Sequence, residues 1–228
     1  IPKDSIDSFK FPNGIFSKTL IPIYDNFIDK KLIKTDYLLM YNDKNVLISD
    51  SKYSAAMSFT HLLCIPNRRI YNCVTLRKKD ISLLKTMTND TQDYFNINYL
   101  ECLSEFGTRC LKYMLENTNK VVDNYDLIER NDITDSFIII LNNVYNKHIN
   151  IRNYNIKDIY KNLLNELNEN NFKNNNKKLE FYFHIHPFHG IGYLHIQCIY
   201  EPLKTKSWNH FILQFIKVND VIKTLEKS

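Results

Sequence analysis

Short stretches of apolar residues, separated by polar turns, recur along this chain and are typical of β-strands. The clearest is His61-Leu62-Leu63-Cys64-Ile65, a nearly continuous apolar run that ends at Pro66. Such a run predicts a strand that is buried on both faces. The other predicted strands are rich in β-branched and aromatic residues and cover residues 20–24, 37–41, 46–48, 179–186 and 193–200.

A second pattern places apolar residues three or four positions apart, as on one face of a helix. Between Asp80 and Phe95 the positions Ile81, Leu84 and Met87 follow this spacing. Further helices are predicted at residues 99–115, 132–147, 156–167 and 209–227. Strands and helices in this order predict an α+β fold, with an antiparallel or mixed sheet and helices packed on it.

Residues 117–178 differ from the rest in composition. Their two predicted helices are flanked by Asn-rich linkers, and residues 173–178 contain no apolar side chain. We therefore predict a main domain formed by residues 1–116 and 179–228. Residues 117–178 are predicted to be a helical, Asn-rich insertion within it.

Composition narrows the functional classes. The net charge is +5, the basic runs are short, and the aromatic residues mostly lie in apolar stretches, so a solvated surface is expected and not one that binds nucleic acid. No stretch approaches the ~20 apolar residues of a membrane span. Five cysteines, an odd number without a CxxC pair, favour a reducing compartment, cytoplasmic or nuclear. Because the chain begins with Ile1 and not Met, the sequence does not decide whether a targeting segment precedes it.

Four of the seven histidines fall within twelve residues: His184, His186, His189 and His195. Alternation along a strand puts His184 and His186 on one face, and His195 and Gln197 together on one face of the next strand. Structural imidazoles are one interpretation, and a zinc site formed by the first three histidines is another. The third is a phosphate-handling site with a nucleophilic histidine. The residues alone leave all three open.

Several segments resemble motifs of the histidine-triad (HIT) superfamily. Residues 193–199 (YLHIQCI) resemble its H-φ-H-φ-H-φ-φ strand, in which φ is an apolar residue, and residues 187–191 (PFHGI) resemble the P-F-x-S-I lead-in of the Hint-type branch. Residues 61–66 (HLLCIP) resemble the H-φ-L-V-V-P strand, and residues 70–78 (IYNCVTLRK) are similar to I-x-N-C-x-T-L-R-K. Residues 208–225 resemble the closing helix. The resemblance implies a HIT-like fold, close to adenosine phosphoramidases and related nucleotide hydrolases.

The resemblance also assigns roles around the phosphate. The middle histidine of the triad attacks the α-phosphorus of a nucleotide, and His195 holds that position. Gln197 holds the third position, where its amide can donate to a phosphate oxygen without carrying charge. Tyr193 replaces the first histidine but keeps the backbone carbonyl that orients the nucleophile. His189 and Gly190, from the lead-in, complete the predicted phosphate-binding set.

The nucleoside is expected to lie against residues earlier in the chain. Asp50 matches the ribose-binding acid of the family, and Ile48 and Ser51 then fall at positions that line the base pocket. His61 matches a histidine near the site, so it is included among the nucleotide-binding residues. The implied ligand is a purine nucleotide or nucleotide conjugate. The resemblance demands no metal or cofactor, and a homodimer is expected by analogy.

These roles imply a nucleotide hydrolase or nucleotidyltransferase that acts on a nucleoside phosphoramidate or polyphosphate through a nucleotidyl-histidine intermediate. The transferase branch of the superfamily also has a glutamine at the third position of the triad, so Gln197 favours transfer slightly. One alternative is a degenerate HIT protein that binds nucleotide or a protein partner without turnover. Its signs are Tyr193, Gly190 where relatives have Ser, and Lys178 near the place of an Asn. A second alternative is a cap or dinucleotide scavenger hydrolase whose larger pocket is roofed by residues 117–178.

Overall fold

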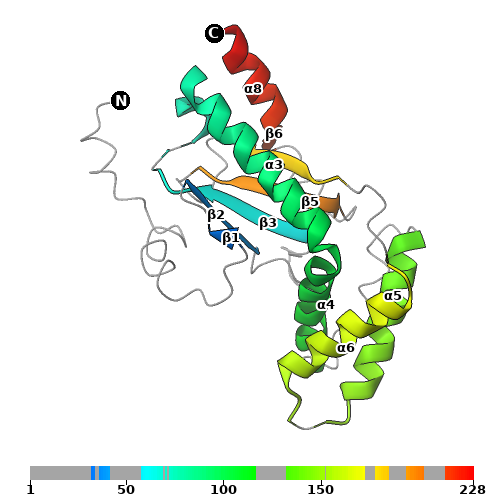
Figure 1. The fold of residues 1–228 in the computed structure, drawn as a ribbon. Coiled ribbons are helices and arrows are strands. Elements are labelled where there is room, and N and C mark those ends of the chain that lie inside the picture. The colour runs from blue at the N-terminus through cyan, green and yellow to red at the C-terminus, as the bar shows by residue number, and fades with distance from the viewer. Residues whose placement is uncertain are drawn as a thin grey trace.

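The computed structural model describes residues 32–33, 36–41, 58–68, 70, 72–116, 132–151, 153–172, 178–184, 194–202 and 214–228. Strands and helices follow one another in separate groups along the chain, as in an α+β fold, which confirms the predicted fold class (Figure 1). The elements are β1 (Leu32–Ile33), β2 (Tyr37–Tyr41), β3 (Ser58–Pro66), the 3-10 turns η1 (Cys73–Thr75) and η2 (Lys78–Asp80), α3 (Ile81–Ile97), α4 (Tyr99–Glu116), α5 (Asp132–His148), α6 (Ile156–Glu169), β4 (Glu180–His184), β5 (Ile196–Pro202), β6 (Phe215–Lys217) and α8 (Val218–Lys227).

The described strands form one six-stranded sheet in the order β1-β2-β3-β5-β4-β6, with every neighbouring pair antiparallel. Strand β3 lies inside the sheet, between β2 and β5, and all nine of its residues are buried. This agrees with the uninterrupted apolar run that predicted it. Leu63 lies opposite Gln197 across the β3–β5 pair, which fixes the register of the two strands.

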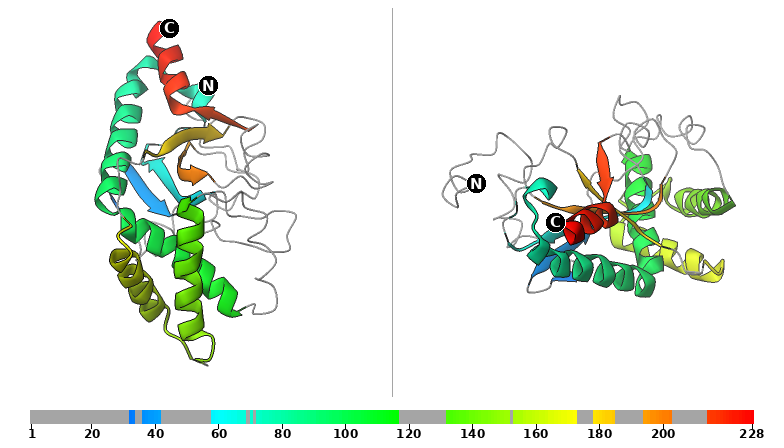
Figure 2. Two further views of the ribbon diagram at one scale, coloured as in Figure 1. Left: turned by 90° about the vertical axis from the view of Figure 1, so that its right-hand side faces the viewer. Right: turned by 90° about the horizontal axis from the view of Figure 1, so that it is seen from above.

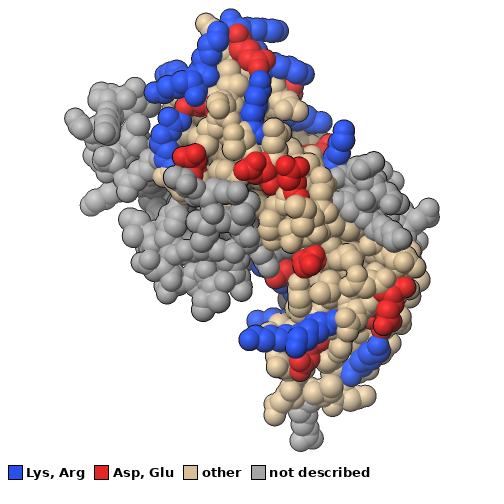
Figure 3. Space-filling view, in the orientation of Figure 1, with Lys and Arg blue, Asp and Glu red and all other residues tan. Residues whose placement is uncertain are grey.

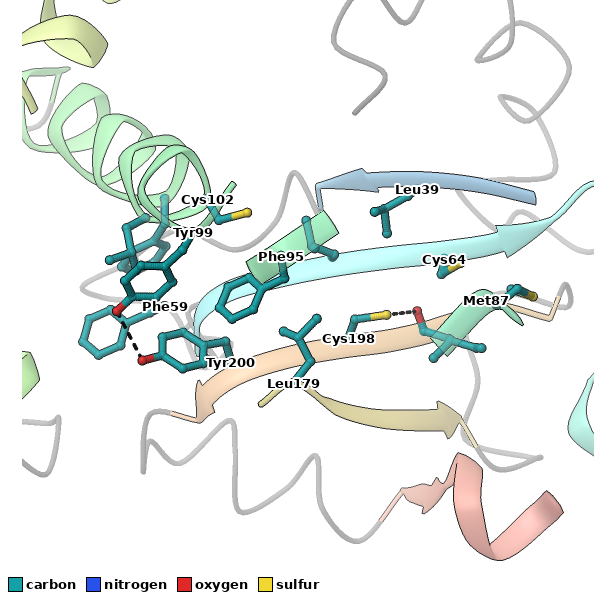
Figure 4. Packing of buried hydrophobic residues seen from close by; sticks show 14 of the residues in the cluster. Leu39, Phe59, Cys64, Met87, Phe95, Tyr99, Cys102, Leu179, Cys198 and Tyr200 are labelled. Atoms are coloured by element: carbon teal, nitrogen blue, oxygen red, sulfur yellow. Dashed lines mark hydrogen bonds between the residues drawn. The ribbon is translucent and has the colours of Figure 1, made fainter. Parts of the chain in front are cut away.

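Helix α3 runs across one face of the sheet (Figures 1 and 2). Its buried positions include Leu84, Met87 and Phe95, which recur at helical spacing and belong to the main hydrophobic core. The sheet contributes alternate residues to the same core, among them Cys64 of β3 and Cys198 of β5 (Figure 4). We call this side of the sheet the helix-covered face.

The core continues from the sheet into the lower helices of Figure 1. Phe59 of β3 packs edge-on against Phe106 of α4 and Phe137 of α5, with ring centroids 5.8 and 5.2 Å apart. Helix α6 packs closely on α4 at Gly107, where a side-chain Cβ would meet Leu163. Helices α5 and α6 therefore share one hydrophobic core with the sheet. That residues 117–178 are an insertion stays a prediction.

The C-terminal segment corrects one prediction. A single helix was expected over residues 209–227, but α8 begins only at Val218 and the strand β6 precedes it. Phe215-Ile216-Lys217 is equally compatible with either structure, and pairing with β4 decides for the strand. The two-residue strand β1 was not predicted at all. The strands predicted at residues 20–24 and 46–48 lie outside the described residues.

Charged side chains cover the upper part of the molecule in Figure 3, around α8 and the start of α3. Basic residues prevail there, but acidic ones are mixed among them, as in the Lys85–Glu226 ion pair at 2.8 Å. A mixed surface of this kind is typical of a solvated face. Among the described residues, no helix is both long enough and apolar enough to cross a membrane.

Candidate functional site

The side of the sheet opposite α3 carries a row of histidines and polar residues. Antiparallel neighbours point to the same face, so Tyr182, which lies opposite Gln197, projects from the same side as Gln197. Two positions further along the same strands, His184 and His195 meet edge to face, with ring centroids 6.3 Å apart. We call this side, defined by His61, Tyr182, His184, His195 and Gln197, the histidine face.

His195 and Gln197 lie next to each other on this face because alternate residues of a strand point the same way. Between them, Ile196 points to the helix-covered face, where it is fully buried in the main core. His195 and Gln197 are 5% and 6% exposed, so both are almost entirely removed from bulk water. His195 directly precedes β5 and Gln197 is the second residue of the strand.

Gln197 is held from the neighbouring strand by His61. The Nε2 atom of His61 and the Oε1 atom of Gln197 are hydrogen-bonded across the β3–β5 pair. His61 is 1% exposed, and burial lowers its pKa to about 4, an effect that the bond to Gln197 opposes and the proximity of His195 reinforces. The imidazole of His61 is therefore neutral near pH 7.

His184 occupies the other side of His195. Its ring stacks on Phe215 of β6, with centroids 4.0 Å apart and an angle of 24° between the planes. Because the edge strand β6 replaces part of the expected helix, this contact could not be predicted from the sequence. The stacking fixes the ring of His184 beside that of His195.

Further along the histidine face, polar groups bind each other. The hydroxyl of Tyr182 donates to Glu180 at 2.6 Å, and the ammonium group of Lys217 lies 3.7 Å from the same carboxylate. Burial, together with this hydrogen bond, raises the pKa of Tyr182 well above its ordinary value. Tyr182 thus remains a neutral hydrogen-bond donor beside Gln197.

The segment before α3 fixes the start of β5. The backbone N–H of Leu194 donates to the carbonyl of Ile70 at 2.8 Å, immediately before His195. Just beyond, the side chain of Asn72 accepts from the N–H of Val74 at 3.1 Å and the hydroxyl of Thr75 donates back to Asn72. These bonds close a capped turn, so the I-x-N-C-x-T pattern acts as a support for the strand that carries His195.

The structure leaves part of the predicted site undescribed. Of the predicted site residues, His195, Gln197 and His61 are described, and they lie together on the histidine face. The remaining predictions lie outside the described residues, namely Ile48, Asp50, Ser51, His189, Gly190 and Tyr193. Two neighbours that sequence reasoning did not assign to the phosphate site, His184 and Tyr182, lie beside His195 and Gln197.

Metal and disulfide chemistry gain no support from the described part of the chain. Within it, no three His, Cys, Asp or Glu side chains are grouped so that they could hold a metal ion. His186 and His189, two of the three residues in the zinc interpretation, lie outside it. All five cysteines are described and are free thiols.

An antiparallel sheet with α3 packed on one face, and with His195 and Gln197 on the opposite face, is the arrangement expected of a HIT protein. A family model described as "Scavenger mRNA decapping enzyme C-term binding" matches residues 22–149, more than half of the chain. The chain therefore belongs to this family, that of the C-terminal HIT-like domain of the scavenger decapping enzyme, and so to the HIT superfamily. No curated protein and no solved structure matches it.

Family membership supports a nucleotide-binding hydrolase of the HIT type. The matched residues include β2, β3 and helices α3 to α5, and they end before the strand that carries His195. The assignment of His195 thus rests on the sequence motif and on its position in the sheet, both independent of the family match.

Proposed function

We propose that this protein hydrolyses a nucleotide polyphosphate through a covalent intermediate on His195. The observation that carries the proposal is the joint placement of His195 and Gln197 on the histidine face, within the sheet of a HIT-family protein. A nucleophile and an uncharged hydrogen-bond donor, one strand repeat apart, can contact the same phosphate group.

In the first step, a ring nitrogen of His195 attacks the phosphorus nearest one nucleoside. A P–N bond forms and the bond to the bridging oxygen breaks, so the remainder of the polyphosphate leaves with the electron pair and takes up a proton. Water then attacks the phosphorus, the P–N bond breaks, and a nucleoside monophosphate is released while His195 is regenerated. Gln197 would donate to a non-bridging oxygen as negative charge develops on it.

The substrate class that we favour is a 5′–5′ polyphosphate-linked dinucleotide such as an mRNA cap remnant. The support is the family, whose description names a scavenger mRNA decapping enzyme. Phosphoramidates and transfer to an acceptor other than water use the same attack by His195, and they remain further outcomes of the same chemistry. We include in the proposal a nucleoside pocket formed by Ile48, Asp50, Ser51 and the phosphate contacts of His189, Gly190 and Tyr193, and a homodimeric assembly.

A second candidate function is nucleotide binding without turnover. The triad of this chain reads Tyr193-x-His195-x-Gln197, and Gly190 stands where many relatives have a serine that assists the leaving group. Loss of that hydroxyl slows the first step more than it weakens binding. A binder of this kind would keep the nucleotide pocket and lose the covalent step.

Intact-mass spectrometry separates the two candidates. The protein is incubated with a cap dinucleotide, a diadenosine polyphosphate and a nucleoside phosphoramidate, and then quenched in alkali to preserve the acid-labile P–N bond. A mass increase of one nucleoside monophosphate, absent in His195→Ala, is expected. If no donor leaves an adduct and none is consumed, while nucleotide still raises the melting temperature, the protein is a binder.

A further inference from the structure

We infer that His61 is a positioning residue, which holds the side-chain amide of Gln197 so that its NH₂ group faces the reactive side of His195. The inference rests on the proposed function, because it explains how Gln197 acquires the orientation that a phosphate contact needs. It rests on a contact between two buried side chains that lie 136 residues apart in the sequence.

The chemistry of the contact fixes the orientation of both groups. A carboxamide oxygen can only accept hydrogen bonds, so the partner of Gln197 Oε1 is a proton on Nε2 of His61. With Oε1 occupied on the β3 side, the two amide N–H groups point away from His61. Gln197 then offers donors alone, the property required to bind phosphate oxygens.

The position of His61 makes this arrangement rigid. His61 lies opposite Ile199 on the inner strand β3 and is buried, so its ring has no freedom to exchange Gln197 for water. Burial keeps the imidazole neutral near pH 7, where its single proton can reside on Nε2. A protonated His61 would place a second cation close to His195 during the reaction, and its neutrality avoids this.

The opposite orientation has a clear chemical cost. If the amide were turned over, Gln197 Oε1 would face the phosphate, and two acceptor groups would repel each other. The proton of His61 would then have to sit on Nδ1, with Nε2 as the acceptor. The tautomer of His61 therefore reports the orientation of Gln197.

A double-mutant cycle tests the functional consequence with a donor that the wild type consumes. His61→Leu removes the donor and should lower kcat about tenfold with little change in KM, the effect of losing one neutral hydrogen bond. His61→Gln should restore much of the rate, because a glutamine Nε2 lies near the position of the imidazole Nε2. In a Gln197→Ala background, His61→Leu should have no further effect. Cys64→Ala, on the same strand but the helix-covered face, is the matched control.

The inference fails if His61→Leu leaves kcat unchanged, or if it slows the reaction equally with and without Gln197. A second measurement needs no turnover and so separates this inference from the proposed function. The ¹⁵N chemical shifts of the His61 imidazole should show a neutral ring protonated on Nε2 throughout pH 5.5–8. A ring protonated on Nδ1, or one that titrates near pH 6.5, overturns the inference even if the enzyme is active.

Discussion

The two faces of the central sheet are equally buried but chemically different. On β5, Ile196 and Cys198 point into the main core, whereas Gln197 and the residue directly before the strand, His195, lie on the histidine face, and all four are at most 6% exposed. Burying an apolar group stabilises the fold, whereas burying an imidazole or amide costs free energy unless it is hydrogen-bonded. Polar groups kept at such positions indicate function. Substitutions on the two faces should therefore separate stability from chemistry.

The largest expected effect is that of His195→Ala on the histidine face. Without the nucleophile, no nucleotidyl adduct can form, and turnover should fall by about 10⁴-fold or more. Intact mass and steady-state rates measure the two effects. Cys198→Ala, three residues along the same strand and on the other face, should keep the adduct. Full turnover by His195→Ala would refute the mechanism proposed for this site.

Gln197→Ala should be the next largest effect. Loss of one donor to the developing charge on the phosphate is expected to lower kcat by about 10²–10³-fold, with a smaller change in KM. Gln197→His, which restores the more common triad residue, should retain hydrolysis. Equal losses in kcat for Gln197→Ala and for the Cys198→Ala control would mean that the two faces do not differ as described.

On the helix-covered face, Met87→Ala should affect stability and leave catalysis intact. The side chain of Met87 is fully buried between α3 and the sheet (Figure 4), and its truncation should lower the free energy of unfolding by about 2–5 kcal/mol. Urea denaturation measures this. Lys85→Ala, exposed on the same helix, should cost less than about 1 kcal/mol. If kcat of Met87→Ala is reduced even at temperatures well below the melting temperature of this variant, the helix-covered face also contributes to catalysis.

Acid should destabilise the protein partly through His61. The pKa of His61 is about 4 in the folded protein against an ordinary 6.5, so between these values the unfolded chain binds a proton that the folded one does not. The stability that His61 contributes is complete above pH 6.5 and is lost as the pH falls toward 4, by about 3 kcal/mol. We therefore expect the free energy of unfolding, measured by urea denaturation, to fall less between pH 7 and pH 4.5 in His61→Gln than in the wild type. Parallel curves for the two proteins would contradict the assigned pKa.

The smallest expected effect concerns the contact between α4 and α6. An alanine at position 107 would crowd Leu163, with Leu141 and Phe137 at 3.0 and 3.1 Å from the new Cβ. The better helix propensity of alanine offsets part of the strain, leaving a net loss of about 1 kcal/mol. In a Leu163→Ala background the penalty should fall to the smaller part that Leu141 and Phe137 cause. An undiminished penalty there would show that α6 does not pack on α4 as described.

The same contact bears on the predicted insertion. Replacing residues 117–178 by a short Gly/Ser loop should leave a protein that unfolds cooperatively, if the main domain is complete without them. The deletion would expose the rings of Phe59 and Phe106 to solvent, so some loss of stability is expected. Loss of cooperative unfolding would place α5 and α6 within the domain. Loss of activity alone would make them a cover for the substrate.

Regular, strongly periodic elements could be predicted from the sequence. The helices predicted at 99–115, 132–147 and 156–167 are observed as Tyr99–Glu116, Asp132–His148 and Ile156–Glu169. Their apolar spacing is local information, so no knowledge of the fold was needed. The strand Phe215–Lys217 could not be predicted in the same way, because its conformation depends on pairing with β4, more than thirty residues earlier.

In the candidate site, too, only the local relations between residues could be predicted from the sequence. His195 and Gln197 could be identified as neighbours, because two residues on one strand face need only alternation. The partnership of His61 with Gln197 depends on the register of β3 against β5, which no local pattern specifies. The motif predicts that His61 binds nucleotide, and that stays a prediction; the bond from its Nε2 atom to Gln197 is a further contact that only the structure shows.

The order of the strands has a consequence for how the protein is made. Strand β3 ends at Pro66, but its partner β5 begins only at Ile196, so about 130 residues must be synthesised between them. At about 5–20 residues per second, the ribosome needs on the order of ten seconds for this length. Throughout that time one edge of this nine-residue strand lacks its final neighbour, and an unpaired strand edge can pair with other chains. Nascent chains of this protein should therefore depend on chaperone protection until the histidine-bearing strand emerges.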